Sequence, residues 1–363
     1  AIDPATLDDD LNAMQQWMVG NTAAAEIDYG TYVFMANRLY QQLVRPYLTT
    51  DTERLILSPD GPLAFLPFET LTTGDDGEDF KTAPYLFRDV EMQYAYSANV
   101  LFRQATQVSN RRPDVLAMSY MDVDDLQKLV AQELQLDHSP LPFSDEEVEG
   151  IAKALGRKRV MRLKGPRASE SAFKAHVADH DIVHLAIHGL GDTISGLNSH
   201  LVFRTDQDTL NDGLLYAEDV YGLQIDHLRM AVLSACETGV GKAFPGEGIF
   251  SIARGFAYAQ TPTTVMSLWK VQDRVTAQIM QDFYRHLAQG KRVSAALREA
   301  KLAYLERTSD RQSPPMYWAP LVAYGEMSPV VPTRNRLLWW SGGVLLMVLI
   351  VGLWRKSRDF SRG

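Results

Sequence analysis

Hydrophobic and polar residues follow two different periods along this chain. Helical periodicity covers residues from about Thr6 to Met18 and from Tyr32 to Val44, and Pro46 stops the second helix. Short apolar, β-branched runs predict strands, and further helical patterns separate them. The expected strands are Arg54–Ser58, Pro62–Phe68, Glu91–Ala95, Asp114–Met118, Val183–Ile187, His200–Arg204, Val232–Ser234, Thr263–Leu268 and Tyr317–Tyr324. The later helices are expected from Ser144, from near Ala217, and over Gly248–Tyr258, Thr276–Leu287 and Ser294–Leu305. This alternation predicts an α/β fold with a largely parallel sheet and helices on both faces.

Two of the predicted strands end in chemically reactive side chains. The run that begins at Val183 ends at His188 and Gly189, and the run that begins at Val232 ends at Cys236. Active sites of open α/β sheets form at the carboxyl ends of strands, where loops converge. We therefore expect an imidazole and the chain's one thiol at the same edge of the sheet.

These residue types suit nucleophilic catalysis. An imidazole such as His188 can take the proton of a nearby thiol, which makes Cys236 a thiolate nucleophile. The backbone N–H groups of Gly189 and Cys236 could form an oxyanion hole. The alternative is that Cys236 is a small buried hydrophobe and His188 a core histidine. Their common placement at strand ends favours catalysis.

The motifs around these residues resemble the CHAT domain, a caspase-like cysteine peptidase module that usually follows tetratricopeptide repeats. The resemblance runs in the expected order from about Tyr40 to Gly325. It rests on the segments Leu57–Gly61, Phe65–Glu69, Leu233–Gly239, Gly246–Gly248, Ser267–Val271 and Tyr317–Pro320. The resemblance implies a caspase-like sheet with a pseudo-caspase half and an active half, and a protein or peptide substrate. It also implies a regulator bound to upstream tetratricopeptide repeats.

The resemblance and the composition together suggest five regions. These are N-terminal helices in residues 1–46, a leading pseudo-caspase half in 47–112, an active half in 113–326, a transmembrane helix in 337–354 and a basic tail in 355–363. The first region is either the end of a repeat array or a collar on the domain. Because the chain begins at Ala1 without an initiator Met, we expect a cut within a longer protein.

Substrate-binding residues are harder to predict. Asp212, Glu237 and Asp273 fall in predicted rim loops, where acidic side chains would attract a basic substrate residue. Acidic residues are frequent throughout the chain, so the cleavage preference stays open. By resemblance, Trp269 forms a wall of the substrate groove, and the alternative is that it caps the core at a strand end.

Composition excludes several classes of function. The chain has 363 residues, of which 46% are hydrophobic, so it can bury a large core. A formal net charge of -9 argues against nucleic acid as a partner, because phosphate binding needs clustered Lys and Arg. One cysteine excludes an intramolecular disulfide and a thiolate zinc cluster. We expect neither a metal nor another cofactor.

The segment 337–354 carries no charge and is just long enough to cross a bilayer. Tryptophans lie at its two ends, where aromatic rings favour the headgroup region. We expect a single pass through a bacterial inner membrane. Four basic residues follow the span and two precede it, which favours a cytoplasmic tail and an extracytoplasmic domain. This difference is small, so the opposite orientation stays open. The four that follow are Arg355, Lys356, Arg358 and Arg362.

The function predicted from the sequence is that of a membrane-anchored cysteine endopeptidase with a His188–Cys236 dyad. The resemblance places its cleavage of a partner protein in a bacterial signalling or defence pathway. The main alternative is a membrane-tethered interaction scaffold that keeps the fold without turnover. A third alternative, an esterase or amidase of small molecules, would need a deep apolar pocket, which nothing in the sequence indicates.

Overall fold

The computed structural model describes residues 4–20, 28–103, 110–120, 141–192, 194–205, 208–235, 238–239, 242–244, 248–270 and 272–332. Residues Ala1–Val331 form one compact unit and Pro332–Gly363 form another. The expected span 337–354 and the tail 355–363 lie outside the described residues. Within the described part of the chain, no helix combines the length and the apolar character that a membrane crossing requires.

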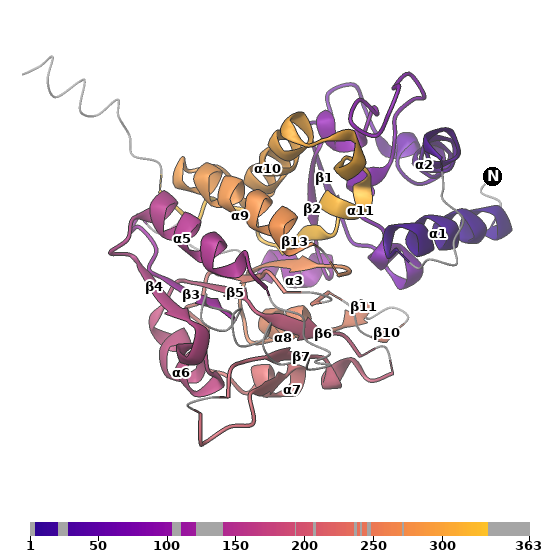
Figure 1. The fold of residues 1–363 in the computed structure, drawn as a ribbon. Coiled ribbons are helices and arrows are strands. Elements are labelled where there is room, and N and C mark those ends of the chain that lie inside the picture. Colours follow the sequence, from indigo (N-terminus) through magenta and orange to yellow (C-terminus); the bar gives the residue numbers. More distant parts are fainter. Residues whose placement is uncertain are drawn as a thin grey trace, which may run out of the picture. The chain divides into compact units, whose positions relative to one another are not determined.

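Helices and strands alternate along the first unit (Figure 1). The α-helices are α1 (Pro4–Met18), α2 (Tyr29–Leu43), α3 (Ala98–Arg103), α5 (Ser144–Leu155), α6 (Glu170–His176), α7 (Ala217–Tyr221), α8 (Ile252–Tyr258), α9 (Asp273–Ala288), α10 (Val293–Arg307) and α11 (Pro315–Trp318). The strands are β1 (Arg54–Leu57), β2 (Glu91–Tyr94), β3 (Val115–Ser119), β4 (Val160–Lys164), β5 (Ile182–Ala186), β6 (His188–Leu190), β7 (His200–Val202), β8 (Leu214–Tyr216), β9 (Met230–Leu233), β10 (Lys242–Phe244), β11 (Gly248–Phe250), β12 (Thr263–Ser267) and β13 (Leu321–Gly325).

Eight strands form the central sheet, in the order β1-β2-β13-β12-β9-β5-β3-β4. Strands β12, β9, β5, β3 and β4 are parallel to one another. Strands β1, β2 and β13 are also parallel to one another. The two groups meet at the antiparallel pair β12 and β13. The largely parallel α/β sheet expected from the sequence is therefore confirmed.

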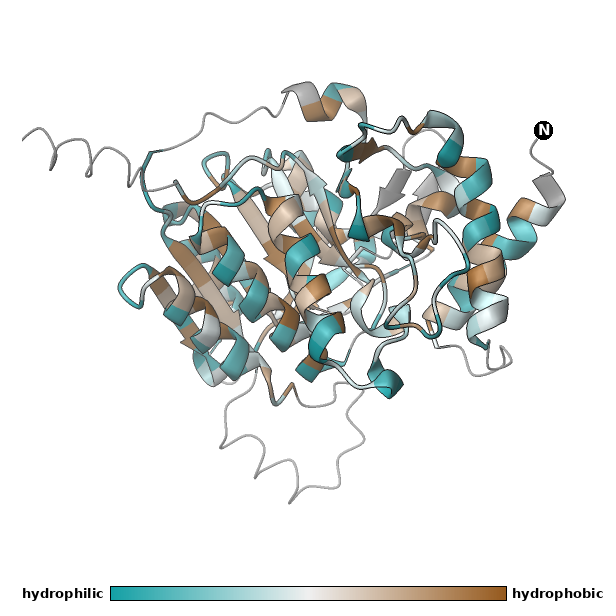
Figure 2. Ribbon diagram, turned by 90° about the horizontal axis from the view of Figure 1, so that it is seen from above, coloured by the Kyte–Doolittle hydropathy of each residue, from teal (hydrophilic) through white to brown (hydrophobic). Residues whose placement is uncertain are grey.

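Helices cover both faces of this sheet (Figure 1). Helices α5, α9 and α10 pack on one face, and α6, α7 and α8 lie on the other. Every residue of β5 and of β9 is buried, as expected for strands covered on both sides. Figure 2 shows the same arrangement as mostly hydrophobic strands beneath helices of mixed character. The core sits between these layers.

The leading and trailing segments of the chain share one sheet. Strands β1 and β2 join through β13, which is the last strand of the chain's first unit. Gln93 of β2 donates a hydrogen bond to the carbonyl of Gly325, 232 residues later. The first two helices pack into the same core as the strands. The regions 47–112 and 113–326 thus contribute strands to one sheet within a single compact unit.

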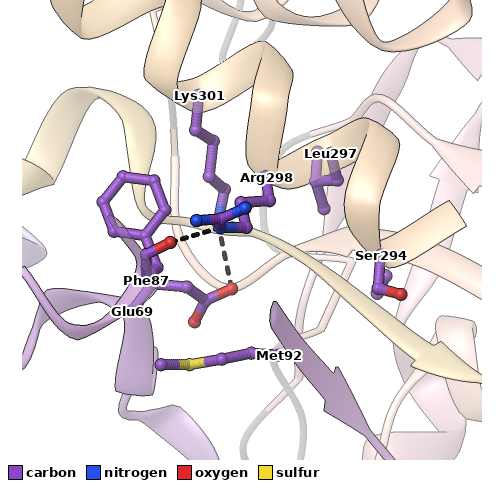
Figure 3. Close-up of a pocket in the computed structure, with 8 residues that line it drawn as sticks. Glu69, Phe87, Met92, Ser294, Leu297, Arg298 and Lys301 are labelled. Atoms are coloured by element: carbon purple, nitrogen blue, oxygen red, sulfur yellow. Dashed lines mark hydrogen bonds and ion pairs between the residues drawn. The ribbon is translucent and has the colours of Figure 1, made fainter. Parts of the chain in front are cut away.

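A buried ion pair links these halves. Lys301 on α10 is 1% exposed and lies 3.1 Å from the carboxylate of Glu69, which belongs to the leading segment. Tyr94 donates a hydrogen bond to the other oxygen of Glu69. Figure 3 shows Lys301 directed at Glu69, with Arg298 bonded to the carbonyl of Phe87 beside it. Charge pairing therefore ties α10 to the 3₁₀ helix Phe68–Thr70, which lies between β1 and β2 in the sequence.

Three local predictions are wrong or incomplete. The strand expected over Pro62–Phe68 contains the 3₁₀ helix Gly61–Phe65, in which Pro62 occupies the first turn, where its missing N–H costs nothing. The strand expected over Tyr317–Tyr324 is split into α11 and β13. The helix expected from Gly248 begins only at Ile252, because β11 precedes it and Ser251 caps the helix.

Candidate active site

The carboxyl ends of β12, β9, β5 and β3 meet at one edge of the sheet. In the pairing of β5 with β9, Leu185 lies opposite Leu233. His188 follows Leu185 by three residues, and Cys236 follows Leu233 by three residues. Paired strands are about 4.8 Å apart. The two segments therefore leave the sheet side by side, although Cys236 and Glu237 lie outside the described residues.

His188 is the first residue of β6, the strand that turns away from the sheet edge. Its partner in the small antiparallel sheet β6-β7-β8 is Val202. The imidazole is 8% exposed and packs against Tyr120, with the ring centroids 4.6 Å apart and the ring planes at 77°. His188 is thus held at the edge of the sheet, where the sequence predicts it.

A second histidine on the same segment has a different environment. His184 lies within β5 and is fully buried under α5 and α9. Its Nε2 is 2.8 Å from the Oε1 of Glu147, and its Nδ1 is 3.2 Å from the hydroxyl of Tyr284. His184 is thus a core histidine with polar partners. His188 is the histidine at the strand end.

Gly189, the residue expected to supply an oxyanion-hole N–H, pairs with Leu201 across β6 and β7. It is buried in the described structure. Its neighbour Leu190 pairs with His200. The backbone that follows His188 is therefore fixed in a short ladder, and the oxyanion role of Gly189 remains a proposal.

The chain that follows Cys236 is anchored to β12. The hydroxyl of Thr238 accepts a hydrogen bond from the N–H of Ser267 at 3.1 Å. The same hydroxyl lies 3.4 Å from the carbonyl of Leu233 and 3.5 Å from that of Ala235. Thr238 is 1% exposed, so these bonds form away from water. Both ends of the short segment that contains Cys236 are thereby held at the sheet edge.

Gly239 completes this anchor. Its N–H donates to the carbonyl of Ser267 at 2.8 Å. A Cβ atom at this position would lie 3.1 Å from a methyl carbon of Leu268 and 3.2 Å from the sulfur of Met266. The contact with β12 is therefore so close that it favours glycine.

Trp269 stands just beyond β12, at the edge that carries His188. Its side chain is 4% exposed, and its indole N–H donates to the carbonyl of Met316 at 3.1 Å. Of the two roles expected for it, this placement favours the cap of the core. An indole that is covered and bonded to α11 has little surface to offer a substrate.

The two described acidic candidates have different environments. Asp212 is exposed, and its carboxylate accepts a hydrogen bond from Leu214 N–H. Asp273 begins α9 and accepts a hydrogen bond from Phe143 N–H at 2.6 Å. Burial raises the pKa of Asp273 to about 6, with a further rise from the charge of Glu147 and an opposing effect of the Phe143 bond. Phe143 directly precedes α5, so the carboxylate of Asp273 is engaged within the fold.

No metal centre is evident in the described ranges. Their His, Cys, Asp and Glu side chains form no group of three or more that could hold a metal ion.

A family model of the CHAT domain matches residues 34–326. This chain belongs to the CHAT domain family. The family expected from the motifs is thus confirmed. Tetratricopeptide repeat protein 28 of Homo sapiens is 24% identical to this CHAT chain over 311 residues, which are 75% of this chain and 12% of that protein. The chain spans only this small share of its curated relative.

Three of the solved structures that are similar to this CHAT chain have low sequence identity to it. Separase of Saccharomyces cerevisiae, solved in complex with securin, is 13% identical, with 83% of this chain and 17% of that chain covered and a TM-score of 0.47. The Arg-specific cysteine proteinase gingipain R is 11% identical, with 90% of this chain and 75% of that chain covered and a TM-score of 0.49. RgpB of Porphyromonas gingivalis, solved with its pro-domain, has the same TM-score.

Two residues at the edge of the CHAT sheet were not predicted from the sequence. Tyr120 follows β3 and contacts the ring of His188, and Thr238 anchors the chain after Cys236. For Tyr120 the available signal was its position two residues after the predicted strand Asp114–Met118. For Thr238 it was a hydroxyl two residues after the candidate nucleophile.

Proposed function

We propose that this CHAT domain is a cysteine endopeptidase that cleaves a partner protein, with Cys236 as nucleophile and His188 as general base. The observation that supports it is the pairing of Leu185 with Leu233, because both candidate residues follow those positions by three residues. His188 begins β6 just beyond the end of β5, at the carboxyl edge where parallel sheets build active sites.

The proposed reaction begins when His188 accepts the thiol proton of Cys236. The thiolate then attacks the carbonyl carbon of the scissile bond. The backbone N–H groups of Gly189 and Cys236 would stabilise the resulting oxyanion. The protonated imidazole gives its proton to the departing amine as the C–N bond breaks, which leaves a thioester. Water then attacks the thioester with His188 as base, and the acid product and the free thiol are released.

The test is covalent labelling of the wild-type chain with a panel of peptidyl acyloxymethyl ketones. Because the sequence contains one cysteine, any thiol adduct found by mass spectrometry identifies Cys236. We expect stoichiometric labelling of the wild type and none of Cys236→Ala. His188→Ala should slow labelling at least about 100-fold, the range in which a general base contributes.

His200→Ala is the matched control, because His200 lies on the neighbouring strand β7 and is partly exposed. It should label at the wild-type rate. If wild type and His188→Ala react equally slowly with every probe while a thiol reagent modifies both, the endopeptidase proposal fails and the non-catalytic scaffold takes its place.

We also propose that residues 337–354 anchor the domain in a bacterial inner membrane. The uncharged segment and its flanking tryptophans support this proposal. The chain should stay with membranes after carbonate extraction, and deletion of 337–363 should release it. External protease added to spheroplasts should digest the large domain if it faces outward, and protection until lysis would indicate the cytoplasmic orientation.

The pathway proposal concerns regulation. We propose that a ligand bound to tetratricopeptide repeats controls the domain in bacterial signalling or defence. The name of the curated relative supports a connection of CHAT domains with such repeats. Co-purification of the full-length protein with its natural partners, followed by labelling of Cys236 with and without them, would test this control.

A further inference from the structure

Three separate segments of the chain meet at the ring of Tyr120. Tyr120 follows β3, His188 begins β6, and Arg204 lies two residues beyond β7. The rings of Tyr120 and His188 are 4.6 Å apart at 77°. The guanidinium carbon of Arg204 is 5.3 Å from the centre of the Tyr120 ring. Tyr120 is thus in contact with His188 and Arg204.

The backbone of Tyr120 is fixed as well. Its N–H donates to the carbonyl of Ala186 at 3.1 Å, which extends the pairing of β3 with β5 beyond the last strand residue. Arg204 is fixed by its own N–H, which donates to the carbonyl of Ala168 at 3.0 Å. Both side chains therefore start from backbone positions that the fold determines.

The geometry limits how the imidazole can turn. A histidine ring rotates about two bonds, and a general base must aim one nitrogen at the thiol. Aromatic rings attract each other in the edge-to-face arrangement seen here. A cation over the tyrosine ring adds an attraction that resists rotation of that ring. The contact between the Tyr120 and His188 rings and the attraction of Arg204 for the Tyr120 ring therefore both act on the orientation of the His188 imidazole.

We propose that Tyr120, supported by Arg204, is a positioning residue that fixes the orientation of the His188 imidazole. The catalytic meaning of this role rests on the proposed endopeptidase function. The ring contact itself is a property of the fold and can be measured without any substrate. A failure of the positioning proposal is therefore distinguishable from a failure of the proposed endopeptidase function.

The first measurement is NMR of the full chain with labelled histidine and tyrosine. The His188 ring signals are assigned by their loss in His188→Ala. We expect a nuclear Overhauser effect between the two rings and a ring-current shift of the His188 protons. Tyr120→Leu should abolish that shift, and Tyr120→Phe, which keeps the ring, should retain it. Absence of the ring contact in the wild type would overturn the proposal whether or not the protein is a peptidase.

The second measurement is the rate at which the best peptidyl electrophile labels Cys236. Tyr120→Leu should slow labelling about three- to tenfold, as expected from loss of one aromatic pair. Tyr120→Phe keeps the ring, so its labelling rate should lie within about twofold of the wild-type rate. Arg204→Met should slow labelling about twofold. Equal loss in Tyr120→Phe and Tyr120→Leu would contradict a role of the ring.

A matched control lies in the same small sheet. Tyr216 and His200 form another tyrosine–histidine pair, with centroids 5.1 Å apart. Tyr216→Leu removes the same ring without touching His188, so labelling should stay at the wild-type rate. If Tyr216→Leu slowed labelling as much as Tyr120→Leu, the effect would come from general loss of packing and the proposal would be wrong. If Tyr120→Leu does not fold, Tyr120→Phe and Arg204→Met decide.

Discussion

Replacing Asp273 by Asn should make the protein more stable at neutral pH. Burial raises the pKa of this carboxyl from 3.8 to about 6, and the charge of Glu147 adds to the rise. Between pH 3.8 and about pH 6 the carboxyl of Asp273 has lost its proton in the unfolded chain but still holds it in the folded protein. A rise in pH through this range therefore favours unfolding. Two pH units correspond to about 3 kcal/mol, and partial solvent access reduces the expected effect to about 1–2 kcal/mol.

The side chain of Asn keeps a carbonyl oxygen that can accept the Phe143 N–H bond. The substitution removes the charge and replaces the second carboxylate oxygen by an NH2 group. The gain in stability should therefore be absent near pH 3.8, grow as the pH rises to about 6, and stay constant above it.

Urea unfolding at intervals between pH 4 and pH 8 measures this dependence. Asp212→Asn is the control, because it changes the net charge equally at an exposed position. A gain in Asp273→Asn that does not vary with pH, or no gain at pH 7.5, would refute the reasoning from burial. A loss of binding to basic peptides without a change in stability would instead support the substrate role expected for Asp273.

Three further substitutions test other parts of the structure. Lys301→Met should cost about 3–5 kcal/mol in urea unfolding, because it leaves Glu69 charged and buried, and Lys301→Met with Glu69→Gln should recover much of that loss. Thr238→Val should cost about 1–3 kcal/mol and slow the labelling of Cys236, because the Ser267 N–H loses its acceptor, whereas Thr238→Ser should retain both properties. Gly325→Ala should lower stability by about 2 kcal/mol or more, measured by thermal unfolding, because Gly325 has a φ of 96° and a Cβ would collide with the carbonyl of Pro262.

The sequence predicts the strands of the site well because local composition decides them. The runs before His188 and Cys236 are apolar and β-branched, and the sheet buries β5 and β9 completely. Such strands can be recognised from their own residues, without knowledge of the strands beside them. Their adjacency in the sheet also follows from the usual construction of parallel sheets.

The errors arise where distant residues decide the conformation. Pro62 permits both a strand edge and a 3₁₀ turn, and the segment forms the turn Gly61–Phe65. The contact of Tyr120 with His188 joins residues from different strands, so no local pattern contains it. Trp269 follows a strand in either interpretation, and only the position of α11 reveals that its indole is covered.

The place of β13 in the sheet has a consequence for biosynthesis. Strand β2 pairs with β13, and Gln93 of β2 donates a hydrogen bond to Gly325, which is synthesised 232 residues later. At the usual speed of translation, about 5–20 residues per second, that interval lasts many seconds. In the last part of that interval, after residue 236 has been added, the ribosome carries a chain that contains both His188 and Cys236 but lacks the strand that joins β2 to β12. A nascent or truncated chain therefore holds the reactive side chains before it holds the completed scaffold, and assembly of the scaffold must await the end of the domain.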